Sequence, residues 1–113
     1  MSGITTHVLD TSLGRPAGGV PVVLEIRGDD GWREVARAET DADGRARHLL
    51  PEGFPFSAGT WRLTFGVGNY FQAKGIESFY PEASVVFVIR DPGQHYHVPL
   101  LLSPFGYSTY RGS

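Results

Sequence analysis

Apolar and polar side chains alternate along several short segments of the chain, and a period of two is typical of half-buried β-strands. In residues 20–27 the even-numbered positions are apolar, and Val23 is the one strongly apolar side chain on the opposite face. In residues 61–67 every odd-numbered position is apolar. Each segment therefore predicts a strand with its apolar face in a core and its other face in solvent.

Further strands are predicted, from the same pattern and from the turn residues between them, at residues 32–39, 45–50, 85–89, 95–103 and 107–111. Residues 28–31 and 41–44 contain the Gly and Asp residues that tight turns need. Residues 85–89 are apolar on both faces. This indicates either a central strand or a strand that another subunit buries again.

One short helix is predicted over residues 70–74, with Asn69 as its cap and Gly75 just past its end. Elsewhere the composition favours strands, because 15 Gly and 8 Pro in 113 residues suit many turns between short strands. The length matches a single domain, residues 1–113, that can bury about two-thirds of its unfolded surface. The prediction is an all-β, two-sheet sandwich of seven to eight strands with one short helix.

Charge and residue types exclude several classes of function. Ten Lys and Arg against twelve Asp and Glu give a net charge of −2, so the chain lacks the basic face that binds nucleic acid. No apolar run approaches the ~20 residues that cross a bilayer, and without cysteine there is neither a disulfide nor a thiolate nucleophile. The first ten residues do not resemble a secretory signal, so a cytoplasmic protein without membrane partners is expected.

Two histidines carry the clearest candidate chemistry. His95 and His97 are two apart in a predicted strand, so both side chains leave the same face, where they could bind a metal or transfer protons. A metal site needs a third ligand, and no local spacing indicates His7 or His48 for it, so no metal is expected. Ordinary packed or solvated histidines remain the alternative. Arg45 directly follows a turn and could be held toward a carbonyl or an anion, although a solvated arginine is commoner.

Three segments together resemble one known family. They are THVLD at residues 6–10 followed by GRPA at 14–17, TDADGR at 40–45, and HYHVPLLLSPFGYSTYRGS at 95–113. The chain resembles the 5-hydroxyisourate hydrolases, the transthyretin-like family of purine catabolism, over essentially its whole length, including ESFYPE at residues 77–82. The terminal YRGS at residues 110–113 is the most specific motif. Transthyretin itself shares the fold but lacks that ending.

The resemblance implies a prealbumin-like sandwich, a homotetramer built as a dimer of dimers, and active sites in a channel between the dimers. It also matches four residues to the catalytic positions of the family: His7, Arg45, His97 and Ser113. Tyr110 matches a substrate-binding position, as His7 and Arg45 also do. No cofactor is implied.

The implied activity is hydrolysis of 5-hydroxyisourate to 2-oxo-4-hydroxy-4-carboxy-5-ureidoimidazoline in urate degradation. Neutral His7 or His97 would take a proton from the attacking water, and Arg45 would polarise the ring carbonyl. Ser113 would contribute its hydroxyl or its terminal carboxylate, and His95 a supporting part. Two non-catalytic alternatives stay open: a transthyretin-like carrier of a small aromatic molecule, and a monomeric interaction module of immunoglobulin type.

Overall fold

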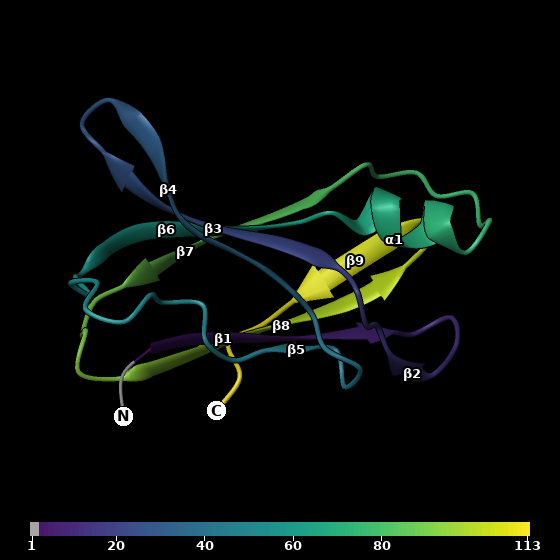
Figure 1. The fold of residues 1–113 in the computed structure, drawn as a ribbon, viewed down its shortest axis with the longest axis horizontal. Coiled ribbons are helices and arrows are strands. Elements are labelled where there is room, and N and C mark those ends of the chain that lie inside the picture. The colour runs from purple at the N-terminus through teal and green to yellow at the C-terminus, as the bar shows by residue number, and fades with distance from the viewer. Residues whose placement is uncertain (1–2) are drawn as a thin grey trace.

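Two β-sheets lie face to face, with one short helix at one end (Figure 1). The computed structural model describes residues 3–113, and in that part of the chain it has nine strands and one helix. In chain order these are β1 (Gly3–Asp10), β2 (Arg15–Pro16), β3 (Pro21–Gly28), β4 (Gly31–Glu39), β5 (Arg45–Ala46), β6 (Gly59–Phe65), α1 (Val67–Ala73), β7 (Ala83–Ile89), β8 (His95–Ser103) and β9 (Gly106–Thr109). The predicted all-β, two-sheet sandwich is confirmed, although residues 3–113 form nine strands and not the predicted seven to eight.

The two sheets differ in strand order and direction. The five-stranded sheet has the order β2-β1-β8-β9, and β5 also pairs with β1. The four-stranded sheet has the order β4-β3-β6-β7. All pairs are antiparallel except β1 and β8, which run parallel from Gly3 beside His95 to Asp10 beside Leu102. This one parallel pair brings the first strand of the molecule onto a strand near the C-terminus.

The core lies between the sheets. It consists largely of the apolar side chains that alternate with polar ones along the strands. Trp61, Leu63 and Phe65 of β6 are each 0% exposed. Val22 and Leu24 of β3 belong to the same cluster. Burying a large apolar side chain stabilises the fold by about 1.5–3 kcal/mol. The predicted inward faces of both strands are therefore confirmed.

Strand β1 is not predicted by the hydrophobic pattern, because its buried face includes two polar side chains, Thr6 and Asp10. The Thr6 hydroxyl donates to the Val98 carbonyl at 2.6 Å. Asp10 accepts hydrogen bonds from the Ser12 side chain and from the Tyr70 hydroxyl, the latter at 2.8 Å. Burial raises the pKa of Asp10, but these hydrogen bonds outweigh burial and hold the pKa below its ordinary value. Both buried polar groups are thus satisfied, and Asp10 ties the end of β1 to α1.

Helix α1 begins earlier than predicted, at Val67 and not after a cap at Asn69. Its buried residues stand on one face at helical spacing: Val67, Tyr70 and Phe71. No side chain in the described part of the chain caps the helix. Because so short a helix is stabilised mainly by packing, the contact of these three buried side chains with the core holds α1 in place. Gly75 lies just past the helix end, as predicted, with a left-handed φ of 69°. No helix within residues 3–113 is long and apolar enough to cross a membrane.

Four strand predictions need correction. The strand predicted at residues 61–67 ends at Phe65, and Val67 is buried as the first residue of α1. The strand predicted at residues 45–50 stops at Ala46, because Leu49 leaves the sheet and is buried in the core. The last strand ends at Thr109, two residues before the predicted end. Residues 85–89 lie in β7, which is an edge strand and not a central one. Its outward-facing Val86 and Val88 are 56% and 48% exposed, so burial by another subunit stays a prediction for this strand.

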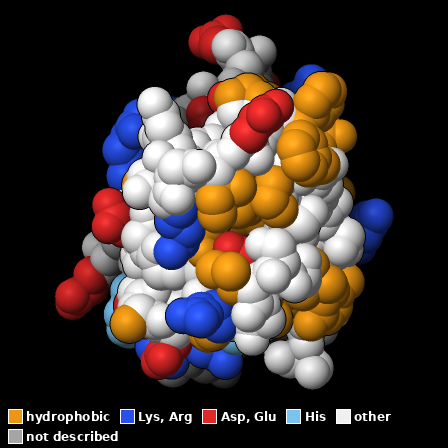
Figure 2. All heavy atoms as spheres, turned by 90° about the vertical axis from the view of Figure 1, so that its right-hand side faces the viewer, with side chains coloured by type: hydrophobic (Ala, Val, Ile, Leu, Met, Phe, Trp, Pro, Cys, Tyr) orange, Lys and Arg blue, Asp and Glu red, His pale blue; other side chains and the backbone are white. Residues whose placement is uncertain are grey.

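The end of the molecule that carries α1 exposes several apolar patches (Figure 2). Phe79 and Tyr80, in the connection from α1 to β7, pack edge-on, with ring centroids 4.9 Å apart. The Tyr80 ring lies 5.2 Å from that of Tyr107 in β9. The Phe79 backbone N–H also donates to the Pro104 carbonyl at 2.8 Å. The ESFYPE segment therefore fastens this connection to the β8–β9 hairpin.

Candidate active site

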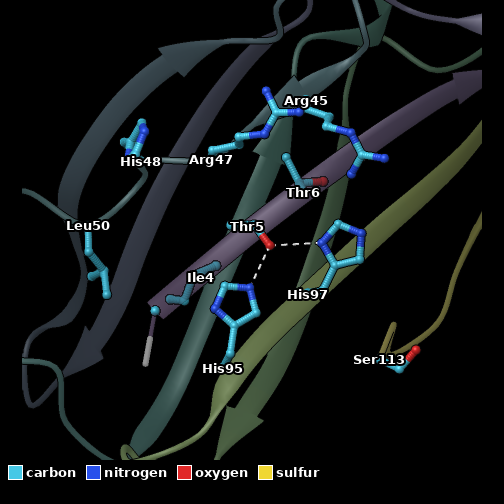
Figure 3. Close-up of a pocket in the computed structure, with 11 residues that line it drawn as sticks. Ile4, Thr5, Thr6, Arg45, Arg47, His48, Leu50, His95, His97 and Ser113 are labelled. Carbon is cyan, nitrogen blue, oxygen red and sulfur yellow. Dashed lines mark hydrogen bonds between the residues drawn. The ribbon is translucent and has the colours of Figure 1, made fainter. Parts of the chain in front are cut away.

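A hollow of about 590 Å³ opens over β1, β5 and β8 of the five-stranded sheet (Figure 3). Its lining includes Thr5, Arg45, His48, His95, His97 and Ser113. These residues come from the two ends of the chain and from one segment in between. The hollow is therefore a product of the fold and of no single sequence motif.

Strand alternation and register set the direction of these side chains. Every second residue of β1 is buried, so Thr5 and His7 share the outward face of the strand. The parallel pairing places Thr5 opposite His97, and the antiparallel pairing with β5 places His7 opposite Arg45. Paired residues present their side chains on the same face of a sheet. The predicted imidazoles and the predicted guanidinium therefore meet on one face.

Thr5 joins the two histidines of β8. Its Oγ1 lies 2.9 Å from Nε2 of His95 and 2.8 Å from Nδ1 of His97 (Figure 3). Both rings leave the same face of β8, as the spacing predicts. The other ring nitrogen of His95, Nδ1, is buried and has no hydrogen-bond partner among residues 3–113. One hydroxyl thus holds two imidazoles in place.

The tight turn before β5 fixes the backbone at Arg45. Oδ1 of Asp41 accepts the backbone N–H of Asp43 at 2.9 Å and that of Arg45 at 3.0 Å. Gly44 has a φ of 76°, and a Cβ there would collide with the Val8 carbonyl oxygen, so this position requires glycine. The predicted turn at residues 41–44 is confirmed.

Two arginines emerge from this turn with different partners. The Arg47 guanidinium forms an ion pair with Asp41 at 3.1 Å. Within residues 3–113 no carboxylate lies within ion-pair distance of the Arg45 guanidinium. The Arg45 guanidinium ends on the His97 side of the hollow (Figure 3). Its hydrogen-bond donors are thus available to an anionic or carbonyl group in the hollow.

The C-terminal residues lie across β8 beside His97. The Gly112 N–H donates to the His97 carbonyl at 2.9 Å. A Cβ at Gly112 would lie 2.5 Å from Cδ2 of the His97 ring and 3.3 Å from Cγ of Pro99. The missing side chain therefore lets the chain pass close to the imidazole and carry Ser113 into the hollow.

His97 is held uncharged by its surroundings. Burial lowers the pKa of His97 below its ordinary value of about 6.5, and electrostatic repulsion lowers it further, most by the Arg45 guanidinium and less by the neighbouring rings of His7 and His95. The Thr5 backbone, by hydrogen bonding with the charged form of the ring, acts in the opposite direction and is outweighed. At neutral pH the His97 ring is therefore a neutral imidazole. Such a ring can accept a proton, and it can both donate and accept a hydrogen bond.

The structure places the predicted site residues in two groups. Arg45, His97 and Ser113 line the hollow together, and His7 stands beside Arg45 on the same sheet face. Tyr110 is 58% exposed and lines a separate hollow of about 300 Å³ with residues of β7 and β8. Within residues 3–113 no three His, Cys, Asp or Glu side chains lie close enough together to hold a metal ion.

Sequence reasoning did not find Thr5 or Arg47. Both line the hollow, and each is two residues from a predicted site residue, Thr5 from His7 and Arg47 from Arg45. Two residues is the spacing that keeps side chains on one face of a strand. For Thr5 that spacing is a signal in the sequence, but it can be used only once β1 is recognised as a strand. Arg47 follows the end of β5, so its place in the hollow does not come from strand alternation.

The HIUase/Transthyretin family model matches residues 4–112. The chain belongs to the HIUase/Transthyretin family. Within this family, a probable 5-hydroxyisourate hydrolase of Caenorhabditis elegans is 50% identical over 112 residues, which cover 99% of this chain and 82% of that protein. A 5-hydroxyisourate hydrolase of Salmonella typhimurium is 48% identical over 110 residues, or 97% of this chain and 80% of that protein.

Solved structures agree with the family assignment. The structure of Klebsiella pneumoniae 5-hydroxyisourate hydrolase matches with a TM-score of 0.84 and 41% identity, covering 97% of this chain and 98% of that one. Sea bream transthyretin in complex with thyroxine matches with a TM-score of 0.88 and 36% identity, covering 96% of this chain and 93% of that one. The resemblance seen in the sequence and the transthyretin-like sandwich are both confirmed.

Proposed function

We propose that this member of the HIUase/Transthyretin family hydrolyses 5-hydroxyisourate to 2-oxo-4-hydroxy-4-carboxy-5-ureidoimidazoline, with the hollow over β1, β5 and β8 as its active site. Curated relatives that match nearly the whole chain carry the name of this activity. The observation that carries the proposal is Arg45, which has no ion-pair partner among residues 3–113, beside a neutral imidazole, His97. This pair suits the addition of water to a carbonyl group.

Hydrolysis of the ring needs three contributions from the protein. A base takes a proton from water, whose oxygen bonds to the ring carbonyl carbon, and the adjacent carbon–nitrogen bond then breaks. A neutral His7 or His97 supplies the base, which is worth about 10² to 10⁴ in rate. Arg45 donates hydrogen bonds to the carbonyl oxygen as negative charge develops there, which is worth about 10² to 10³. Ser113, by its hydroxyl or its terminal carboxylate, helps to orient the substrate or the water.

The proposed assembly is a homotetramer, a dimer of dimers, with the hollows facing a channel between dimers. Two features of the single chain support it. The edge strand β7 exposes Val86 and Val88, which a neighbouring subunit would cover. Tyr110 lies outside the hollow of its own chain, so it would contact substrate from a neighbouring subunit.

A non-catalytic carrier is the second candidate, because the chain is 36% identical to a transthyretin solved with thyroxine. The two candidates differ in one measurable result. A carrier binds a small aromatic molecule and leaves it unchanged. A hydrolase consumes 5-hydroxyisourate.

The test follows the ultraviolet absorbance of freshly prepared 5-hydroxyisourate with and without the protein. We expect the protein to accelerate the decay by orders of magnitude, and His97→Ala to remove most of that acceleration. Thr64→Ala, on the outward face of the other sheet, is the control and should leave turnover unchanged. Decay at the uncatalysed rate, or full activity of His97→Ala, would refute the assignment. Residues added after Ser113 should also lower turnover if that terminus belongs to the site.

A further inference from the structure

The hydroxyl group of Thr5 faces two imidazoles and has a single proton to give (Figure 3). Its Oγ1 lies within hydrogen-bond distance of Nε2 of His95 and of Nδ1 of His97. A hydroxyl donates once and accepts up to twice, and a neutral imidazole has one N–H and one bare nitrogen. The three groups are therefore coupled, because the position of one proton restricts the positions of the other two.

His95 decides the direction of this hydrogen-bonded chain. Its Nδ1 is buried and has no partner among residues 3–113. A proton on Nδ1 would therefore be a buried N–H with no acceptor in the described part of the chain. Buried N–H groups left without a partner are rarer than acceptors left without one. The proton of His95 thus belongs on Nε2, from which it is donated to Oγ1 of Thr5.

The Thr5 hydroxyl can then donate its proton to only one of the two rings. Because Oγ1 already accepts from His95, its own proton points to Nδ1 of His97, and that nitrogen must be bare to accept it. Neutral His97 therefore carries its proton on Nε2. The reverse arrangement would move the proton of His95 onto its buried nitrogen without a partner.

We propose that Thr5 is a positioning residue that holds His95 and His97 as Nε2–H tautomers, so that His97 enters the reaction as a neutral hydrogen-bond donor. This inference rests on the proposed function and deepens it. With its Nε2–H, His97 donates to the carbonyl oxygen together with Arg45, and a neutral imidazole can polarise a carbonyl in this way. His7 is the imidazole that is left to act as base.

The proton balance of this scheme closes through His7 alone. His7 takes one proton from water as the water oxygen bonds to the carbonyl carbon. When the ring carbon–nitrogen bond breaks, the nitrogen keeps the electron pair and takes the proton from His7, which becomes neutral again. His97 and Thr5 keep their protons throughout. Their contribution is orientation and charge stabilisation.

Nitrogen NMR of ¹⁵N-labelled histidine tests the tautomers independently of turnover. Each ring at neutral pH reports which nitrogen carries the proton, and H95Q and H97Q assign the signals. We expect a protonated Nε2 and a bare Nδ1 in both His95 and His97, and a mixture of tautomers at His97 in Thr5→Val. A proton on Nδ1 of His97 in the unsubstituted protein overturns the proposal, whether or not Thr5→Val folds.

A matched pair of variants tests the role of the hydroxyl in hydrolysis. Thr5→Val keeps the shape and removes the hydroxyl, whereas Thr5→Ser keeps the hydroxyl. We expect Thr5→Val to lower kcat about tenfold or more, with KM changed by less than about threefold, and Thr5→Ser to restore most of kcat. Equal losses in both variants overturn the proposal. A failure of the proposed function is distinguishable, because the unsubstituted protein would then leave 5-hydroxyisourate intact while showing the expected tautomers.

Discussion

The outward faces of the two sheets both carry arginines and both are hollowed, yet their charges are arranged differently. On the four-stranded sheet, a hollow of about 290 Å³ is lined in part by Arg62 and Glu25, which form an ion pair at 2.7 Å. The Arg62 guanidinium also lies 4.3 Å from the centre of the Trp32 ring. On the five-stranded sheet, the larger hollow contains Arg45, for which residues 3–113 provide no ion-pair partner.

This difference distinguishes a structural surface from the surface that carries the proposed active site. Arg62 is already paired and stacked within the protein, because it binds the Glu25 carboxylate and its guanidinium lies over the Trp32 ring. Arg45, for which residues 3–113 provide no carboxylate partner, creates a positive region that favours an anionic or polarised ligand and lowers the pKa of His97. Pairing is thus a better indicator of the site than the number of charged residues on a face.

The largest effect is expected from Arg45→Met. It removes the donors proposed to stabilise the oxyanion, and loss of one such group costs about 10² to 10³ in turnover. Arg62→Met makes the same change on the other face, where it breaks an ion pair worth about 1 kcal/mol. We expect Arg62→Met to lower Tm slightly and to leave turnover of 5-hydroxyisourate within about twofold. Similar losses of turnover in the two variants would contradict the distinction between the faces.

Gly112→Ala should have the second-largest effect. The added Cβ would overlap Cδ2 of His97 and turn the ring away from Thr5. A displacement of about 1 Å can cost roughly 10²-fold, so we expect kcat to fall by about 10 to 100-fold. Gly106→Ala is the matched control, because its Cβ would meet Ser103 Oγ at an ordinary 3.7 Å. If the two alanine variants turn over substrate equally well, the tail does not position His97.

The smallest expected effect is a shift in the titration of His97. Burial is the largest cause of its lowered pKa and stays in place in Arg45→Met, but the largest electrostatic contribution, that of the Arg45 guanidinium, is removed. The pKa of His97 should therefore rise toward its ordinary value without reaching it. The neutral ring would then be lost at a higher pH as the solution is acidified. Proton NMR of the His97 ring measures this midpoint, and a midpoint that is unchanged or lower would show that Arg45 does not act on the ring.

The sequence predicted those parts of the molecule that depend on local pattern. Alternation located β3 and β6 with their inward faces, and turn residues located the loop that holds Arg45. The spacing of His95 and His97 correctly placed both rings on one face. Each of these features depends on neighbours within a few residues, and period and turn chemistry report such neighbours directly.

The features that the sequence did not predict depend on distant neighbours. Strand β1 does not show the alternation of apolar and polar residues, because Thr6 and Asp10 are buried and form hydrogen bonds with β8 and α1. The contact of Thr5 with both histidines needs the parallel register between β1 and β8, which no local signal specifies. The direction of Tyr110, away from the hollow, likewise follows from where β9 lies in the sheet. These features are therefore determined by the pairing of distant strands, which the local sequence pattern does not specify.

The parallel pairing of β1 with β8 also has a consequence for biosynthesis. Thr5 and His97 are 92 positions apart, so at roughly 5–20 residues per second the ribosome needs several seconds to make the partner strand after β1 has appeared. Until then β1 has an unsatisfied edge, and contacts between such distant segments form slowly. The nascent protein would be most vulnerable to aggregation in this interval, and the histidine pair becomes usable only at the close of folding.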